Sequence, residues 1–250
     1  MSDNSIELRG LTKRFDNTVA VDDLSLTVRD DETYGFLGPN GAGKSTTISM
    51  LLDYRRPTEG TVRVLGQDPH TDGAEVRSRI GTLPDGYSTY DKLSARRHLR
   101  FVIDTKGADD DPEELLERVG LTDVIDDPAG TFSQGMKQRL ALAMALVGDP
   151  ELLILDEPFT GLDPHGVRTV RDIVRAERER DTAVFFSSHI LGQVELVCDR
   201  IGILHSGRLI AEGTLDELKA GIDADEDASI EDIFVAYTND SVRATTEGIR

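Results

Sequence analysis

The chain is poor in cysteine and has no long apolar run. Cys198 is the only cysteine among 250 residues, so we expect no disulfide framework and a small core thiol in a reducing compartment. The longest aliphatic run, residues 140–147, is too short to cross a bilayer. Residues 1–7 are polar, and we do not expect them to act as a secretory signal. If the function involves a membrane, another chain supplies the span.

Basic residues and paired histidines are also scarce. The formal charge is −19, from 28 basic and 47 acidic residues, and only six of the bases are Lys whereas 30 of the acids are Asp. A chain this acidic is a poor candidate for binding nucleic acid. Few Lys, abundant Asp and no Trp favour a surface that stays hydrated in high salt, where screening relieves self-repulsion. An ordinary acidic cytosolic protein is the alternative. The five histidines show no spacing that suggests a zinc site.

A phosphate-binding loop is the most specific pattern present. Residues 38–45 read Gly-Pro-Asn-Gly-Ala-Gly-Lys-Ser, between a short apolar stretch (residues 33–37) and a helical pattern from Thr46. In this context the loop's backbone N–H groups and the helix N-terminus face phosphates, Lys44 reaches the terminal ones, and the Ser45 hydroxyl binds Mg²⁺. A glycine-rich turn is the alternative. The expected nucleotide-binding residues are Gly38, Pro39, Asn40, Gly41, Ala42, Gly43, Lys44, Ser45 and Thr46.

Two carboxylates follow an apolar stretch later in the chain. Residues 152–155 read Leu-Leu-Ile-Leu, and Asp156 and Glu157 come directly after them. At the carboxyl end of a strand Asp156 can hold Mg²⁺ beside nucleotide phosphates, and Glu157 can act as a general base on water. A strand followed by a polar turn is the alternative, and the upstream phosphate loop makes it the weaker one.

A third pattern lies about twenty residues before these carboxylates. Ser133, Gln134, Gly135 and Met136 precede an apolar-faced helix. Ser133 is well placed as the N-cap of that helix, and Gly135 permits close approach of an anion to the helix end. Taken alone, this pattern indicates only a helix start.

Strand and helix patterns alternate along the chain, which indicates an α/β fold with a parallel sheet. An all-helical segment over residues 86–147 interrupts the alternation, with helix starts at Ser94 and Asp111. A later helix follows Pro164, a capping box begins at Thr214, and residues 221–227 form an acidic linker to a last helix over residues 229–237. The predicted strands cover residues 6–8, 24–28, 33–37, 61–65, 80–83, 152–155, 182–186, 201–204 and 208–212.

In order and spacing of motifs, residues 4–215 resemble the nucleotide-binding subunit of an ATP-binding-cassette (ABC) transporter. The phosphate loop and the Asp156-Glu157 strand fit the two ATPase motifs of that family, and Ser133-Gln134-Gly135-Met136 is similar to its signature. The resemblance implies a P-loop NTPase (RecA-like) core with an N-terminal antiparallel β subdomain and an inserted α-helical subdomain. It implies one ATPase domain over residues 1–221 and a linker and C-terminal helix over residues 222–250.

Further positions carry roles that the resemblance implies. Phe15 fits the aromatic position that stacks on adenine, Asp163 lies in a segment similar to the dimer-interface loop, and His189 resembles the switch histidine that supports hydrolysis with Glu157. Asp85 departs from the family, which has Gln or Glu there. It remains a candidate for binding Mg²⁺ through water, and an exposed turn residue is the alternative.

The resemblance also implies partners. Two cassettes, identical or different, pack head to tail, and each ATP lies between Lys44 of one subunit and Ser133 and Gly135 of the other, with Mg²⁺ on Ser45 and Asp156. The helical segment and the Asp85 loop would contact an integral-membrane permease at the cytoplasmic face of the cell membrane.

The tail and the signature favour export over solute uptake. Residues 229–234 are similar to a C-terminal motif of cassettes that serve ABC-2-type exporters of drugs, lipids or ions, or systems for copper-related maturation of nitrous-oxide reductase. Two alternatives remain: a soluble cassette ATPase that assists an assembly such as iron–sulfur biogenesis, and a phosphate-loop switch without sustained turnover. The presence of both Glu157 and His189 disfavours the switch.

Overall fold

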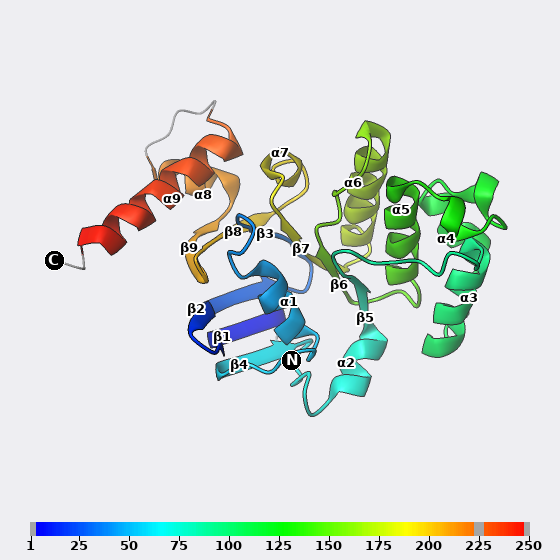
Figure 1. Ribbon diagram of the computed structural model, residues 1–250, viewed down its shortest axis with the longest axis horizontal. Coiled ribbons are helices and arrows are strands. Elements are labelled where there is room, and N and C mark those ends of the chain that lie inside the picture. The colour runs from blue at the N-terminus through cyan, green and yellow to red at the C-terminus, as the bar shows by residue number, and fades with distance from the viewer. Residues whose placement is uncertain (1–3, 223–227, 248–250) are drawn as a thin grey trace.

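The computed structural model describes residues 4–222 and 228–247, which form two sheets with helices around them (Figure 1). The smaller sheet is antiparallel, in the order β2-β1-β4, and lies at the lower left of Figure 1. It confirms the expected N-terminal β subdomain, although its strands are longer than predicted. They are β1 (Asn4–Phe15), β2 (Thr18–Arg29) and β4 (Glu59–Val64).

The larger sheet has six strands in the order β5-β6-β7-β3-β8-β9. Its first five strands pair in parallel, and β9 returns antiparallel to β8 as the predicted hairpin. Every residue of β3, β6 and β7 is buried, as expected of parallel strands covered on both faces. The strands are β3 (Thr33–Leu37), β5 (Ile80–Leu83), β6 (Leu152–Asp156), β7 (Ala183–Ser188), β8 (Arg200–His205) and β9 (Arg208–Gly213).

The chain between β5 and β6 is helical and forms the right-hand end of the molecule in Figure 1. Ser94, Asp111 and Ser133 cap its helices as predicted, each accepting a backbone N–H from the first turn. Leu99, Leu116 and other buried apolar side chains make this segment continuous with the core around the large sheet. Its elements are α3 (Ala95–Lys106), α4 (Pro112–Arg118), two short 3₁₀ turns (Thr122–Val124 and Ala129–Thr131) and α5 (Gln134–Ala145).

Several boundaries differ from the sequence prediction. Helix α1 begins at Lys44 rather than Thr46, because the phosphate loop turns directly into it. Helix α9 runs over Ile230–Glu247, well beyond the predicted residue 237. Residues 223–227 of the predicted acidic linker lie outside the described residues. The remaining helices are α2 (Gly73–Arg79), which the sequence did not predict, α6 (Pro164–Arg178), α7 (Leu191–Val194) and α8 (Leu215–Ala220), which opens with the expected capping box at Thr214.

No helix among the described residues is long and apolar enough to cross a membrane. The topology does bring chemistry together at one place. Parallel pairing sets Leu37 beside Ser188 and Asp156 beside Ser187, so the carboxyl ends of β3, β6 and β7 meet at one edge of the sheet. That edge, where the loops after the strands emerge, is where open α/β sheets bind ligands.

Candidate nucleotide-binding site

The loop after β3 has the geometry of a phosphate cradle. Gly43 stands at φ +112° immediately before α1, and a Cβ there would lie 2.5 Å from the Ala20 carbonyl oxygen, so only glycine fits. Gly38 and Ala42 are buried beneath the loop, whereas Pro39, Asn40 and Gly41 are exposed. The loop thus turns directly into the N-terminus of α1, where the first backbone N–H groups have no partner within the helix and can bind an anion.

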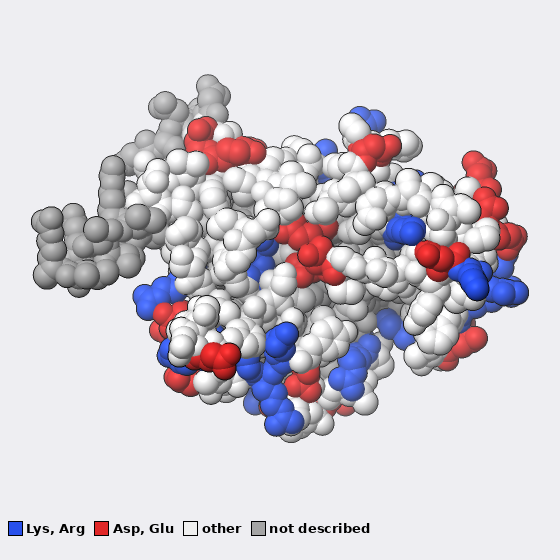
Figure 2. Space-filling model, in the orientation of Figure 1, with Lys and Arg blue, Asp and Glu red and all other residues white. Residues whose placement is uncertain are grey.

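A cavity of about 340 Å³ opens at this loop. In Figure 2, Asp and Glu side chains gather near the middle of the face, in the region of β7, whereas Lys and Arg lie mainly along its lower part and at its right-hand end. The cavity itself is lined by two carboxylates, Asp85 and Glu157, together with residues of the phosphate loop. Its lining residues are Ala20, Pro39, Asn40, Gly41, Gly43, Lys44, Ser45, Thr46, Asp85, Glu157, Thr160 and His189.

Lys44 is the buried cation of the cavity. Its side chain is 6% exposed, its Nζ donates to the Gly38 carbonyl at 2.7 Å, and it lies 3.3 Å from Glu157 Oε1. The ammonium is therefore held between the loop backbone and the carboxylate predicted as the general base. The cavity wall therefore contains a buried ammonium group, which is a type of donor that can form charge-assisted hydrogen bonds with phosphate.

Asp156 lies at the end of β6 among hydroxyl groups. Burial raises its pKa above the ordinary value, while hydrogen bonds from the Ser187 and Ser45 hydroxyls counteract the rise. Asp85 is close enough to raise the pKa slightly further. Carboxylate and hydroxyl oxygens from Asp156, Ser45 and Asp85 are the hard donors that Mg²⁺ prefers, so these residues fit the ion.

Glu157 and His189 form a pair at the cavity wall. His189 Nδ1 lies 2.8 Å from Glu157 Oε2, and the His189 backbone N–H donates to the same oxygen at 3.3 Å. Glu157 is 9% exposed and the His189 side chain 40% exposed, so the carboxylate is buried behind a ring that reaches solvent. The pairing is what a general base and its orienting group require.

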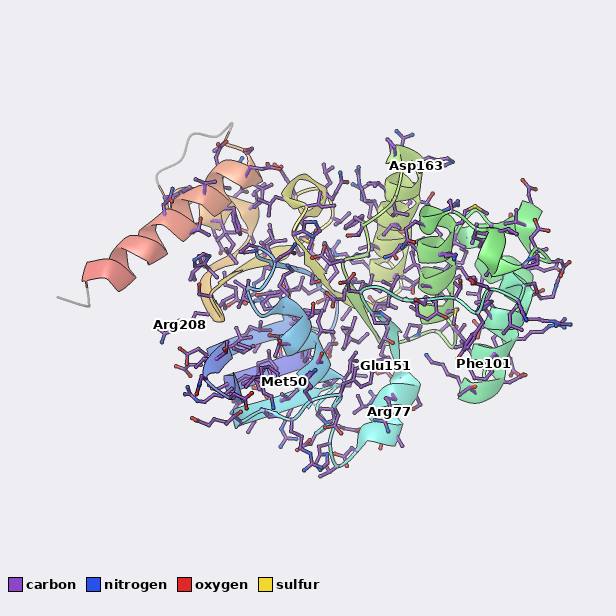
Figure 3. The ribbon with its side chains drawn as sticks, in the orientation of Figure 1. Met50, Arg77, Phe101, Glu151, Asp163 and Arg208 are labelled. Carbon is purple, nitrogen blue, oxygen red and sulfur yellow. The ribbon has the colours of Figure 1, made fainter. Side chains whose placement is uncertain are left out.

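Other predicted residues lie apart from the cavity. Ser133, Gln134 and Gly135 open α5 and do not line it, nor do Phe15 and Asp163, within the described part of the chain. The Asp163 side chain caps α6 by accepting the Gly166 N–H at 2.7 Å, and Figure 3 labels it at the start of that helix. The Phe15 ring has Lys13 Nζ and the Arg55 guanidinium over it, 5.2 and 5.1 Å from its centroid.

Sequence reasoning missed some contributors. The Ser187 hydroxyl, bonded to Asp156 and to the Glu157 N–H, lies in the segment similar to the switch histidine but was given no role. Gln138 Nε2 donates to the Glu157 carbonyl at 3.3 Å from α5. Thr160 and Ala20 line the cavity from a turn and from β2. No spacing rule marks Gln138, because its contact depends on how α5 packs against the turn after β6.

Comparison with known proteins agrees with this geometry. Residues 21–160 match the family model described as ABC transporter. The chain is 45% identical over 208 residues to an uncharacterized ABC transporter ATP-binding protein, YhcH, of Bacillus subtilis, covering 82% of this chain and 68% of that protein.

Two further relatives have more specific names. The chain is 42% identical to the bacitracin transport ATP-binding protein BcrA of Bacillus licheniformis, covering 86% of this chain and 71% of that protein. It is also 42% identical to the daunorubicin/doxorubicin resistance ATP-binding protein DrrA of Streptomyces peucetius, covering 87% of this chain and 68% of that protein.

A solved structure described as the ATP-binding subunit of an ABC transporter superposes with a TM-score of 0.86 at 29% identity, covering 93% of this chain and 99% of the other. The P-loop NTPase fold, the ATP-binding domain and the ATPase activity expected from the sequence are therefore confirmed at the level of the family. The chain belongs to the ABC transporter family, as an ATP-binding subunit.

Proposed function

We propose that this chain hydrolyses MgATP to energise an ABC-2-type membrane exporter. The observation that carries the proposal is the meeting of Lys44, Glu157 and His189 at one cavity, with Asp156 and Ser45 beside it. These side chains supply a cation for phosphate, a buried general base with its orienting group, and oxygen donors for a divalent ion.

The resting contacts suggest how the base becomes available. Glu157 Oε2 is held by His189, and Oε1 faces Lys44. The phosphates of ATP give Lys44 a stronger partner than one carboxylate oxygen, and Oε1 is then free to accept a proton from the attacking water. Ser45, Asp156 and Asp85 would hold Mg²⁺, which supplies charge neutralisation at the phosphates when bound.

A second cassette would complete the site. Ser133, Gln134 and Gly135 lie at the exposed or half-buried start of α5, apart from the cavity of their own chain. The N-terminus of a helix can bind a phosphate, and a twofold arrangement would supply one from the partner's ATP. We propose a homodimer in which each ATP lies between the two chains, with Asp163 near the interface and Phe15 stacked on adenine.

A second groove, beside β5, is the proposed contact site for the permease. It measures about 360 Å³ and lies between α2 and β5 on one wall and α3 and α5 on the other, with Tyr54, Tyr87, Val102 and Met144 among its lining residues. Figure 3 labels Arg77, which lines it, on α2. Pro84 lines the groove and the next residue, Asp85, lines the nucleotide cavity. A helix of the permease seated there would contact the loop that senses nucleotide.

The proposed localisation follows from this arrangement: a peripheral protein on the cytoplasmic face of the cell membrane. The names of BcrA and DrrA, which refer to antibiotic transport and drug resistance, favour export of an amphipathic molecule. The transported molecule would bind in the permease.

The test is isolation of the chain with its membrane partner. The expected result is co-purification of an integral membrane protein from detergent-solubilised membranes, and stimulation of ATPase activity when both are reconstituted in vesicles. Co-purification with soluble proteins alone, and ATPase activity indifferent to membranes, would favour the soluble assembly ATPase instead. Absence of ATP hydrolysis under all conditions would overturn the function altogether.

A further inference from the structure

Glu157 has a backbone conformation that its residue type disfavours. It stands at φ +53°, in the left-handed region, where an L side chain is crowded by its own backbone. Such a residue keeps this conformation only when surrounding contacts impose it, and these positions cluster at functional sites. The direction of the Glu157 carboxylate therefore depends on what holds its backbone.

Both backbone polar groups of Glu157 are held. Its N–H faces the carbonyl and the hydroxyl oxygens of Ser187, each at 3.2 Å. Its carbonyl accepts the Thr160 N–H at 3.2 Å and the Gln138 side-chain amide at 3.3 Å. Ser187 and Thr160 belong to the neighbouring strand and the same turn. Gln138, by contrast, belongs to α5 in the helical segment between β5 and β6.

The start of α5 packs against the same turn. A Cβ on Gly135 would lie 3.3 Å from the Gly161 carbonyl oxygen, and a Cβ on Gly161 would lie 2.9 Å from the Gln134 side chain. The first turn of α5 therefore packs directly against Gly161, so a shift of α5 would disturb this part of the turn after β6. Gln138, one turn further along α5, makes the hydrogen bond within this contact.

We propose that Gln138 is a positioning residue for hydrolysis. Its amide holds the Glu157 carbonyl, so that the left-handed backbone keeps the carboxylate between Lys44 and His189. Because Ser133 and Gly135 on the same helix face the partner's nucleotide under the function proposed above, Gln138 also makes the orientation of Glu157 depend on the placement of α5. A nucleotide in one composite site thereby affects the base of the other.

Gln138→Leu tests this role, because it keeps the size of the side chain and removes the amide donor. We expect kcat to fall about tenfold while KM for ATP stays within about twofold, since the lost contact orients the base and touches no part of ATP. The kcat of Gln138→Glu should fall at least as far, because an ionised Glu has no N–H to donate. Lys137→Ala is the matched control on the same turn. Its ammonium faces Asp91 at 3.5 Å, away from Glu157, so its kcat should equal that of the parent chain.

A second readout separates positioning from mere packing. In the Glu157→Gln background, the Gln138→Leu variant should still form an ATP-dependent dimer, measured by size-exclusion chromatography with light scattering. A kcat of Gln138→Leu equal to the parent's would overturn the inference. A fall in kcat accompanied by loss of the ATP-dependent dimer would also overturn it, because the defect would then lie in the shape of α5.

Failure of the inference is distinguishable from failure of the proposed function. If Glu157→Gln alone hydrolyses ATP normally, the base assignment is wrong and the proposed mechanism falls with it. If Glu157→Gln is inactive and Gln138→Leu is as active as the parent, only the role of Gln138 is wrong.

Discussion

The cavity at the strand ends and the start of α5 differ in how complete each is within one chain. In the cavity, Lys44 and Glu157 are buried and in contact with each other, and Glu157 also contacts His189; beside the cavity, the buried Asp156 accepts a hydrogen bond from the Ser187 hydroxyl. At the start of α5, the Ser133 hydroxyl caps its own helix by accepting the Met136 N–H, and the residue is exposed. The difference shows that one chain already holds its buried polar residues in contact with one another, whereas the start of α5 lies exposed and, in the proposed function, completes the site of a second cassette.

The largest expected effect comes from removing the general base, Glu157. Glu157→Gln keeps the shape but cannot accept a proton from water, so hydrolysis should fall about a thousandfold while ATP binding persists. Turnover assays and fluorescent-nucleotide binding measure the two. The variant should accumulate as an ATP-bound dimer. Turnover at the parent rate would show that Glu157 is not the general base, and the buried pair of Glu157 and His189 would then have no role in hydrolysis.

A smaller effect is expected from removing the cavity's cation. Lys44→Ala leaves the phosphate charge without its buried partner, and ATP affinity should weaken about tenfold to a hundredfold. Isothermal titration calorimetry with MgATP measures it, and Lys137→Ala serves as a control for loss of a lysine elsewhere. Unchanged affinity would count against the phosphate-loop assignment.

Asp85 tests the connection between the cavity and the permease groove. It lines the cavity from the beginning of the loop after β5, between Pro84, which lines the groove, and Gly86, which has φ +66°. We expect Asp85→Ala to reduce permease stimulation of ATPase several-fold while basal activity and ATP affinity change little. Asp85→Asn and Asp85→Gln, compared with and without the permease, show whether charge or length matters. Coupling equal to the parent's in all three would make Asp85 a turn residue only.

The smallest effect concerns the whole surface rather than either region. With a net charge of −19, self-repulsion weakens the folded state in dilute buffer, and salt screens it. The melting temperature should rise by several degrees as KCl goes from dilute to molar, measured by differential scanning fluorimetry. A flat or falling curve would contradict adaptation to high salt without affecting the site.

The residues that line the cavity were largely predictable from the sequence, because most of them lie at the carboxyl ends of strands or directly after them. A loop of fixed spacing before α1 and two carboxylates at the carboxyl end of β6 must lie at the same edge of the sheet when the strands run parallel side by side, as β3, β7 and β6 do. The caps at Ser94, Asp111 and Thr214 were predictable for a similar reason, since each needs only a bond within a few residues.

Contacts between distant elements were not predictable. The hydrogen bond from Gln138 to Glu157 depends on the packing of α5 against a turn nineteen residues away, and the residue type of Glu157 gives no sign of its left-handed backbone. Helix α2 was missed because its short polar sequence, with Val76 as its buried apolar side chain, shows no clear helical period. The length of α9 was underestimated for a related reason, since its last turns have few apolar residues.

The central claim is that one chain supplies the cavity and its partner supplies the start of α5, and mixing two defective chains tests it most directly. Ser133→Arg changes an exposed side chain, and Lys44→Ala changes the cavity, so each homodimer has two defective sites. In a mixed dimer, one site combines an intact cavity with an intact α5. The account predicts that ATPase activity, absent from either parent alone, rises as the two are mixed and peaks near equal amounts. Activity that stays as low as the parents' at every ratio would contradict it.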